Sequence, residues 1–132
     1  MAREYTTSKT LHTYEKINIE MVKGDNLTLV LDLDAIDEND QVVEVPLTGA
    51  RIKFTTRKTA EGGTVVICKD TATGGIIITD PAHGVAEVYL APADTENVTP
   101  GKFYYDIQVQ LADGMVYTPV KGELVIVTDV TH

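Results

Sequence analysis

The sequence predicts an all-β fold, an antiparallel β-sandwich of about eight or nine short strands. Apolar and polar residues alternate with a period of two along most of the chain, turn residues separate these runs roughly every 8 to 12 residues, and no stretch sustains a helical period. A chain of 132 residues is long enough for one domain with a continuous core. We therefore expect one β-sandwich domain over residues 17–132, preceded by an extended polar arm at 1–16.

Alternating patterns place the first strands. In KINIEMV, residues 16–22, apolar residues alternate with Asn18 and Glu20, and in NLTLVLDLD, residues 26–34, four leucines share one face. ARIKFTTRK, residues 50–58, and GVAEVYL, residues 84–90, alternate in the same way. The expected inward-facing residues are Ile17, Ile19, Met21, Leu27, Leu29, Leu31, Leu33, Ile52, Phe54, Ala86, Val88 and Leu90.

Three further runs are short and rich in β-branched residues, as the core strands of a sandwich are. They are TVVIC, GIIIT and GELVIVT, which begin at residues 64, 75 and 122. The turn segments between strands are DENDQ, EGG, DPAHG and ADG, which predict mainly hairpin connections. APADTEN, residues 91–97, is the one helix-like segment, and Pro92 is placed to open a single turn.

The most regular segment is PGKFYYDIQVQLADGMVYTPVKGELVIV, residues 100–127, which predicts a hairpin that turns at ADG. Its register puts Phe103 and Tyr105 on the apolar side, where their rings would fill the core and a Tyr hydroxyl would find a backbone partner. Tyr104 falls on the polar side beside Asp106. Tyr104 is therefore the better candidate for a contact residue.

The composition and charge exclude several classes of function. A net charge of −9 argues against nucleic-acid binding, which depends on Lys and Arg. No apolar run approaches the roughly 18 residues of a membrane span, and no secretory signal is present, so we expect no membrane partner and cytosolic synthesis. The basic residues Arg51, Lys53, Arg57 and Lys58 cluster on a predicted strand, which favours a solvated face over a phosphate site.

Candidate chemical sites are weak. Cys68 is the only cysteine and, among β-branched neighbours, is expected to be buried or half-buried. The acidic run DLDAIDENDQ, residues 32–41, favours a solvated hairpin turn, with a Ca²⁺ site at the sandwich edge as the alternative.

His12, His83 and His132 lack the spacing of a metal site, and Ser8 lies in the polar arm outside any nucleophile motif. We expect no enzyme activity, no catalytic or metal-binding residue, no cofactor and no small-molecule ligand.

Four segments of the sequence, taken together in their order and spacing, resemble segments of a known protein family. They are KGDNLTLVLDL, PLTGARIKFTTRK, IIITDPAHGVAEVYLAPADTENV and the hairpin segment at residues 100–127. Over roughly Ile17 to Thr128, the chain resembles the immunoglobulin-like modules of tailed-bacteriophage virion proteins. The nearest resemblance is to the N-terminal domain of phage baseplate upper proteins and to small head-fibre, neck and tail accessory proteins.

The resemblance implies a structural or adaptor subunit of a phage particle, present in multiple symmetric copies and made in the bacterial host cytoplasm. Implied partners are capsid, neck, portal, tail or baseplate proteins and further copies of the chain. Baseplate upper proteins continue into a helical, receptor-binding-protein-anchoring region, whereas this sequence stops at TDVTH, which favours a stand-alone module. No catalytic residue is implied.

The polar arm and one sheet edge are the expected contact regions. Alone, the arm would be disordered, so the hypothesis is that neighbouring subunits hold it, with Tyr5, Leu11 and Tyr14 as contact residues beside Tyr104. A carbohydrate- or cell-surface-binding module is the alternative function, weakened by the absence of Trp. A fragment of a secreted adhesin is disfavoured because the signal is missing.

Overall fold

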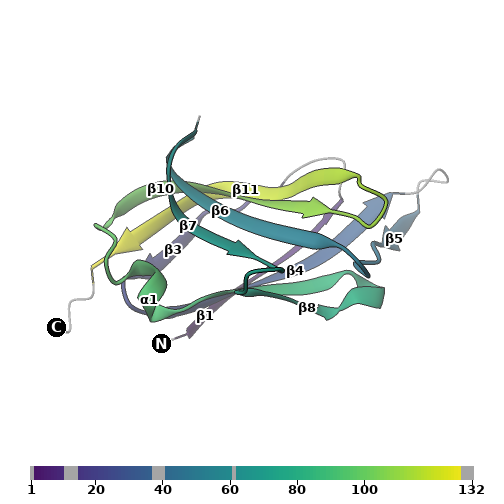
Figure 1. The fold of residues 1–132 in the computed structure, drawn as a ribbon, viewed down its shortest axis with the longest axis horizontal. Helices are drawn as coiled ribbons and strands as arrows, with labels where there is room; N and C mark the ends of the chain where they lie inside the picture. Colours follow the sequence, from purple (N-terminus) through teal and green to yellow (C-terminus); the bar gives the residue numbers. More distant parts are fainter. Residues whose placement is uncertain (1, 11–14, 37–40, 61, 129–132) are drawn as a thin grey trace.

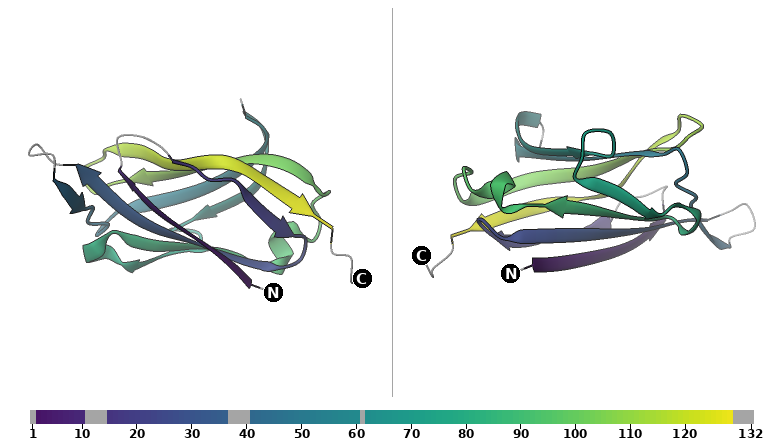
Figure 2. Two further views of the ribbon diagram at one scale, coloured as in Figure 1. Left: turned by 180° about the vertical axis from the view of Figure 1, so that it is seen from behind. Right: turned by 60° about the horizontal axis from the view of Figure 1, so that its bottom comes forward.

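The computed structural model describes residues 2–10, 15–36, 41–60 and 62–128, and these form a sandwich of two β-sheets. Figures 1 and 2 show the two sheets as stacked layers. The five-stranded sheet contains β1 (Ala2–Thr10), β4 (Asn26–Ile36), β9 (Val85–Leu90) and β8 (Ile76–Asp80), in that order, with β5 (Val42–Glu44) paired to β4. The six-stranded sheet contains β2 (Glu15–Lys16), β11 (Val116–Val127), β10 (Gly101–Gln110), β6 (Arg51–Thr59) and β7 (Gly62–Asp70), with β3 (Ile19–Val22) paired to β11. The predicted sandwich is therefore confirmed.

The core lies between the two sheets and follows the predicted alternation. The four leucines of β4 that share a face, Leu27, Leu29, Leu31 and Leu33, are all at most 2% exposed. Facing them, β6, β10 and β11 contribute side chains such as Phe54, Ile107 and Leu124. Phe54 and Tyr105 stack with their ring centroids 5.4 Å apart. Burying these side chains supplies the main driving force for folding.

The segment expected as a polar arm contains two strands. Residues 2–10 form β1, which pairs in parallel with β4 of the same chain from Ala2↔Asn26 to Thr10↔Asp34. Residues 15–16 form β2, which pairs in parallel with β11. The arm is therefore held in part by its own domain, because the outer edge of β4 offers unpaired backbone groups that a Thr-rich segment can satisfy.

The sequence predicted antiparallel pairing, but some strands of the sandwich pair in parallel. Besides β1, both β2 and β3 run parallel to β11. The described residues form eleven strands instead of about eight or nine. The additional strands, which include β1, β2 and β5, are short or polar, and their pairing depends on edges that other strands supply.

The segment that links β2 to β3 passes very close to the backbone of Gly122 on β11, which the absence of a side chain at Gly122 allows. A Cβ atom at this position would lie 2.1 Å from the carbonyl oxygen of Ile17. Ile17 N donates to the Lys121 carbonyl oxygen at 3.1 Å, and Glu123 N donates to Asn18 Oδ1 at 3.1 Å. The buried Tyr105 hydroxyl donates to the Ile17 carbonyl oxygen, so the predicted backbone partner of a core tyrosine is confirmed.

The predicted turns also form where they are described. Gly114 at φ 92° closes the β10–β11 hairpin, and Asp113 Oδ1 accepts from Met115 N at 2.9 Å. DPAHG becomes the short helix η1 (Pro81–His83), which ends at Gly84. APADTEN becomes the single turn α1 (Pro92–Thr95), opened by Pro92 as predicted. The turn DENDQ lies mostly outside the described residues.

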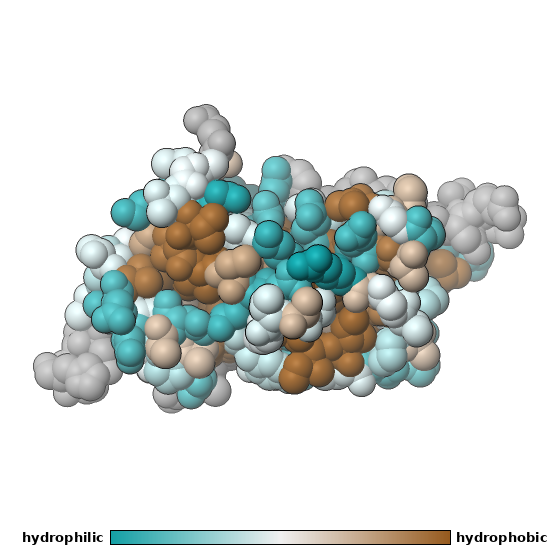
Figure 3. Space-filling view, viewed as in Figure 1, coloured by the Kyte–Doolittle hydropathy of each residue, from teal (hydrophilic) through white to brown (hydrophobic). Residues whose placement is uncertain are grey.

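The strands β7 and β8 form the edges of their sheets on one side of the sandwich, and a bridge between Asp70 and Gly75 joins them. Both expose apolar side chains, Val65 at 43% and Ile77 at 55%. Figure 3 shows hydrophobic residues in two areas of this view, where Figure 1 draws β7 and β8. The prediction that Cys68 is buried or half-buried is wrong: on the edge strand β7 its side chain is exposed.

A candidate interaction site on the six-stranded sheet

Cross-strand register brings polar residues from four strands together on the outer face of the six-stranded sheet. Tyr104 on β10 lies between Arg57 of β6 and Glu123 of β11. In the next row, Asp106 lies between Thr55 of β6 and Lys121 of β11. Lys121 in turn pairs with Lys16 of β2. Because residues of equal parity share a face of a strand, these side chains form one surface.

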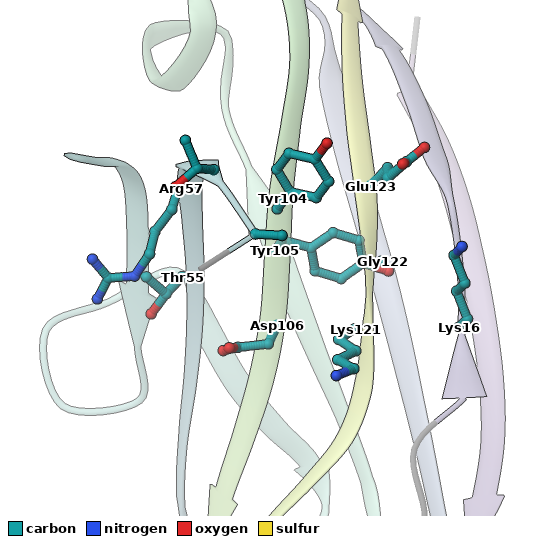
Figure 4. A pocket seen from close by; sticks show the side chains of 11 residues that line it. Lys16, Thr55, Arg57, Tyr104, Tyr105, Asp106, Lys121, Gly122 and Glu123 are labelled. Atoms are coloured by element: carbon teal, nitrogen blue, oxygen red, sulfur yellow. The ribbon is translucent and has the colours of Figure 1, made fainter. Parts of the chain in front are cut away.

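This surface is hollowed into a pocket of about 340 Å³. Figure 4 shows Tyr104 between Arg57 and Glu123, with Lys121 and Lys16 on the adjoining strands. Tyr105 lies beneath, with its ring directed past Gly122. The lining residues are Lys16, Thr55, Arg57, Thr59, Ala60, Tyr104, Tyr105, Asp106, Lys121, Gly122 and Glu123.

The pocket combines one half-buried aromatic ring with charges of both signs. Arg57 donates to the Gly63 carbonyl oxygen at 3.0 Å, which fixes its guanidinium near the rim. Glu123 lies 3.7 Å from Lys102 Nζ. The pocket therefore offers charged donors and acceptors around Tyr104, an arrangement that suits recognition of a polar or charged partner.

Asp106 is the carboxylate at the centre of this charge pattern. Desolvation raises the pKa of Asp106 above its ordinary value, and the positive charges of Arg57, Lys121 and Lys53 act in the opposite direction. Three cations thus act on one carboxylate. The surroundings of Asp106 are cationic although the chain as a whole carries a net charge of −9.

Of the predicted contact residues, Tyr104 lies in the pocket. Tyr5 lies on β1 opposite Leu29 of β4, in the other sheet. Leu11 and Tyr14 lie outside the described residues. The four predicted sites are therefore not one cluster in the described part of the chain, and their role in contacts stays a prediction.

The predicted basic cluster is divided by the alternation of β6. Arg51, Lys53 and Arg57 lie on the outer face of the sheet, as predicted, whereas Lys58 falls on the opposite parity. Arg51 forms an ion pair with Asp70, 2.8 Å apart. Sequence reasoning did not assign Lys16, Asp106 and Lys121 to the same site, because their proximity depends on inter-strand register.

A smaller charged cluster joins η1 to β5. His83 Nδ1 lies 2.9 Å from Asp80 and its Nε2 lies 3.9 Å from Glu44. The hydrogen bond with Asp80, together with the negative charges of Asp80 and Glu44, raises the pKa of His83 above its ordinary value. All three side chains are exposed, and their charges lie at the end of the five-stranded sheet where η1 meets β5.

Within the described ranges, no group of three or more His, Cys, Asp or Glu residues is arranged to hold a metal ion. The same part of the chain contains no helix with the length and apolar character to span a membrane. Asp32 and Asp34 lie on β4, but the acidic residues 37–40 that would complete the alternative Ca²⁺ site lie outside the described residues.

Comparison with known proteins identifies the fold. No family model matches the sequence, and no curated protein matches it. Among solved structures, the N-terminal domain of phage TP901-1 ORF48 is similar, with a TM-score of 0.58 and 10% sequence identity over 94% of this chain and 98% of that chain. At this identity the likeness concerns the fold, and the immunoglobulin-like classification stays a prediction. The chain therefore has the fold of a domain that is found in a phage protein.

Proposed function

We propose that this chain is a structural subunit of a bacteriophage particle, acting through protein–protein contacts in multiple copies and without catalysis. The single observation that carries the proposal is the likeness to the ORF48 domain, which extends over nearly the full length of both chains. The sequence resemblance to phage baseplate, neck and tail modules supports the same function independently of any single motif. Partners would be other virion proteins, and the chain would be made in the host cytoplasm and incorporated into the virion.

Two features of the fold suit such a role. The edge strands β7 and β8 present apolar side chains beside unpaired backbone groups, which can accept a strand from a neighbour. The pocket around Tyr104 presents charges of both signs on the outer face of the six-stranded sheet. In an assembly of many copies, many such weak contacts would act together and hold the subunits more tightly than one contact could.

The direct test is quantitative mass spectrometry of purified particles. We expect the chain in particles at a fixed ratio to the major capsid protein, with a copy number set by the symmetry of its site. Its absence from purified particles would contradict the proposal. Immunogold labelling would then assign its position to head, neck, tail or baseplate.

The role of residues 1–16 needs a test that respects the fold. Deleting them would remove β1 and β2, which pair within the chain, so a loss of incorporation would have two explanations. The double variant Leu11→Ser/Tyr14→Ser keeps both strands. We expect this variant to be incorporated into particles less well than the wild type, with an unchanged melting temperature. Unchanged incorporation would show that these two side chains are not needed for the contact.

A carbohydrate-binding function is the second candidate, and the pocket favours it specifically. Tyr104 offers a ring face, while Asp106, Arg57 and Glu123 offer hydrogen-bonding groups around it. NMR titration of the protein with host cell-wall saccharides should shift the amide signals of β10 and β11, and Tyr104→Ala should abolish the shifts. Tyr89→Ala, on the other sheet, is the matched control.

A further inference from the structure

The two outer faces of the sandwich carry opposite charge. On the six-stranded sheet, register and burial assign ten charged residues to the outer face, which we name the basic face. Its basic members are Lys16, Arg51, Lys53, Arg57, Lys102 and Lys121, and its acidic members are Glu20, Asp70, Asp106 and Glu123. A cationic surplus on one face stands out in a chain with a net charge of −9.

The surplus is concentrated at the pocket. Asp70 is occupied by Arg51, with 2.8 Å between the charged atoms, and Glu123 lies near Lys102. Arg57, Lys53 and Lys121 all act on the carboxylate of Asp106, and Arg57 and Lys121 line the pocket together with Lys16. The centre of the basic face is therefore its most cationic part, and it is also the part that is hollowed.

The outer face formed by β4, β5, β8 and β9 of the five-stranded sheet, which we name the acidic face, has the opposite character. Asp32 and Asp34 alternate with the buried leucines of β4, and register places Glu44 of β5 beside Asp34. Glu87 of β9 lies beside Val30 on the same face. Among the described side chains of β4, β5, β8 and β9 there is no Lys or Arg.

We propose that the acidic face of one copy binds the basic face of a second copy, with carboxylates of β4 and β9 seated at the pocket between Arg57 and Lys121. The inference rests on the proposed function, because a particle that holds several copies brings these faces together. A second copy fits as the occupant because the basic face has more cations than carboxylates, whereas the described side chains of the acidic face include carboxylates and no Lys or Arg.

The position of the faces determines the type of contact. They lie on opposite sides of the sandwich, so one molecule cannot pair its own two faces. A contact between them is heterologous, and it generates a ring when the rotation between copies closes and an open array when it does not. Electrostatic complementarity of this kind sets orientation and association rate, and it weakens with salt.

Sedimentation velocity of the purified chain tests the inference. At about 0.02 M salt, where the Debye length exceeds 20 Å, the weight-average sedimentation coefficient should rise with protein concentration. At about 0.5 M salt it should return to the monomer value because surface charges are then screened. A chain that stays monomeric in both conditions overturns the inference.

Two neutralising variants locate the contact. K53Q/R57Q removes two cations of the basic face, and D32N/E87Q removes two carboxylates of the acidic face. Each should weaken self-association by about tenfold or more. K58Q, next to Arg57 but of opposite parity on β6, and E96Q, just after α1, are matched controls that should leave association unchanged. Circular dichroism melting confirms that every variant is folded.

Mixing the two variants tests the head-to-tail geometry. Each variant keeps one intact face, so an equimolar mixture should form a 1:1 dimer that does not grow further. No association in the mixture, or equal association in the controls and the face variants, overturns the inference. If the chain is nevertheless found in purified particles, the proposed function stands without this contact.

Discussion

The hydroxyl group of Tyr105 donates a hydrogen bond to the carbonyl oxygen of Ile17, 2.6 Å away and 88 residues earlier in the chain. The bond joins the interior of β10 to the link between β2 and β3, and its donor is 4% exposed. A bond so remote in sequence and so well shielded fixes the position of the N-terminal strands against the sheet. It also permits a clean test.

Tyr105→Phe removes this hydrogen bond and keeps the aromatic ring. The Ile17 carbonyl then loses its side-chain donor, and the free energy of unfolding should fall by about 1 kcal/mol. Urea titration followed by circular dichroism measures the change. Tyr104→Phe, on the outer face of the same strand, is the control and should leave the free energy of unfolding within about 0.5 kcal/mol of wild type.

Gly122→Ala should be more destabilising than Tyr105→Phe. The added Cβ would meet the Ile17 carbonyl oxygen at 2.1 Å, and backbone on backbone cannot yield as a side chain can. We expect a loss of about 3 kcal/mol in the free energy of unfolding. Gly24→Ala isolates the cost of a left-handed backbone, because nothing lies within 4 Å of its added Cβ. An equal loss in both variants would refute the close-approach argument.

Thr56→Val should leave stability unchanged or raise it by up to about 1 kcal/mol. Thr56 is 0% exposed, between Ile67 and Tyr105 in the sheet, and its Oγ1 has no hydrogen-bond partner among the described residues. Valine has the same shape without the polar atom. Thr55→Val, which faces outward, is the comparison, and chemical denaturation gives both values. A clear loss at Thr56 would indicate that its hydroxyl is bonded.

His83 should make the folded chain more stable at low pH than at high pH. Its pKa is raised in the folded chain by Asp80 and Glu44, so the charged imidazole stabilises the fold below its ordinary pKa of about 6.5. That contribution is lost as the pH rises through the folded pKa. NMR titration of the imidazole should give a pKa above the ordinary value, and Asp80→Asn should lower it. An unchanged pKa in Asp80→Asn would contradict the assignment.

Cys68 should react with a thiol reagent in the native state, because its side chain is exposed on β7. We expect one thiol per chain to be labelled without denaturant. The double variant Cys68→Ser/Ile67→Cys moves the thiol one position, to a site only 4% exposed, and should be protected. Equal labelling rates in the two proteins would show that β7 is not held as described.

The sequence predicted those parts of the fold that depend on local alternation. The leucines of β4, the inward Phe103 and Tyr105, and the outward Tyr104 all follow from a period of two, since a strand with one buried face must alternate. Turn residues such as Gly114 predicted the last hairpin for the same local reason.

The parts that were missed depend on which strands are neighbours. A polar segment such as residues 2–10 has no apolar alternation in its sequence to indicate a strand, and it pairs because β4 offers an edge. Cys68 was expected to be buried or half-buried because its neighbours are β-branched, yet on β7 it alternates with the buried Ile67 and is exposed. Lys16, Arg57 and Lys121 converge only through register across β2, β6, β10 and β11, which a single sequence does not encode in any local pattern.

The position of β11 has a consequence for biosynthesis. The strand lies inside the six-stranded sheet, between β10 and the pair β2 and β3, although it follows all of them in the chain. During translation, β3 emerges about a hundred residues before its partner, since Leu124 pairs with Ile19, and the ribosome adds about 5 to 20 residues per second. β3 must therefore wait for seconds without the neighbouring strand that pairs with it. Until then the nascent chain leaves the apolar side chains of β3, Ile19 and Met21, on an incomplete sheet, a state that favours aggregation.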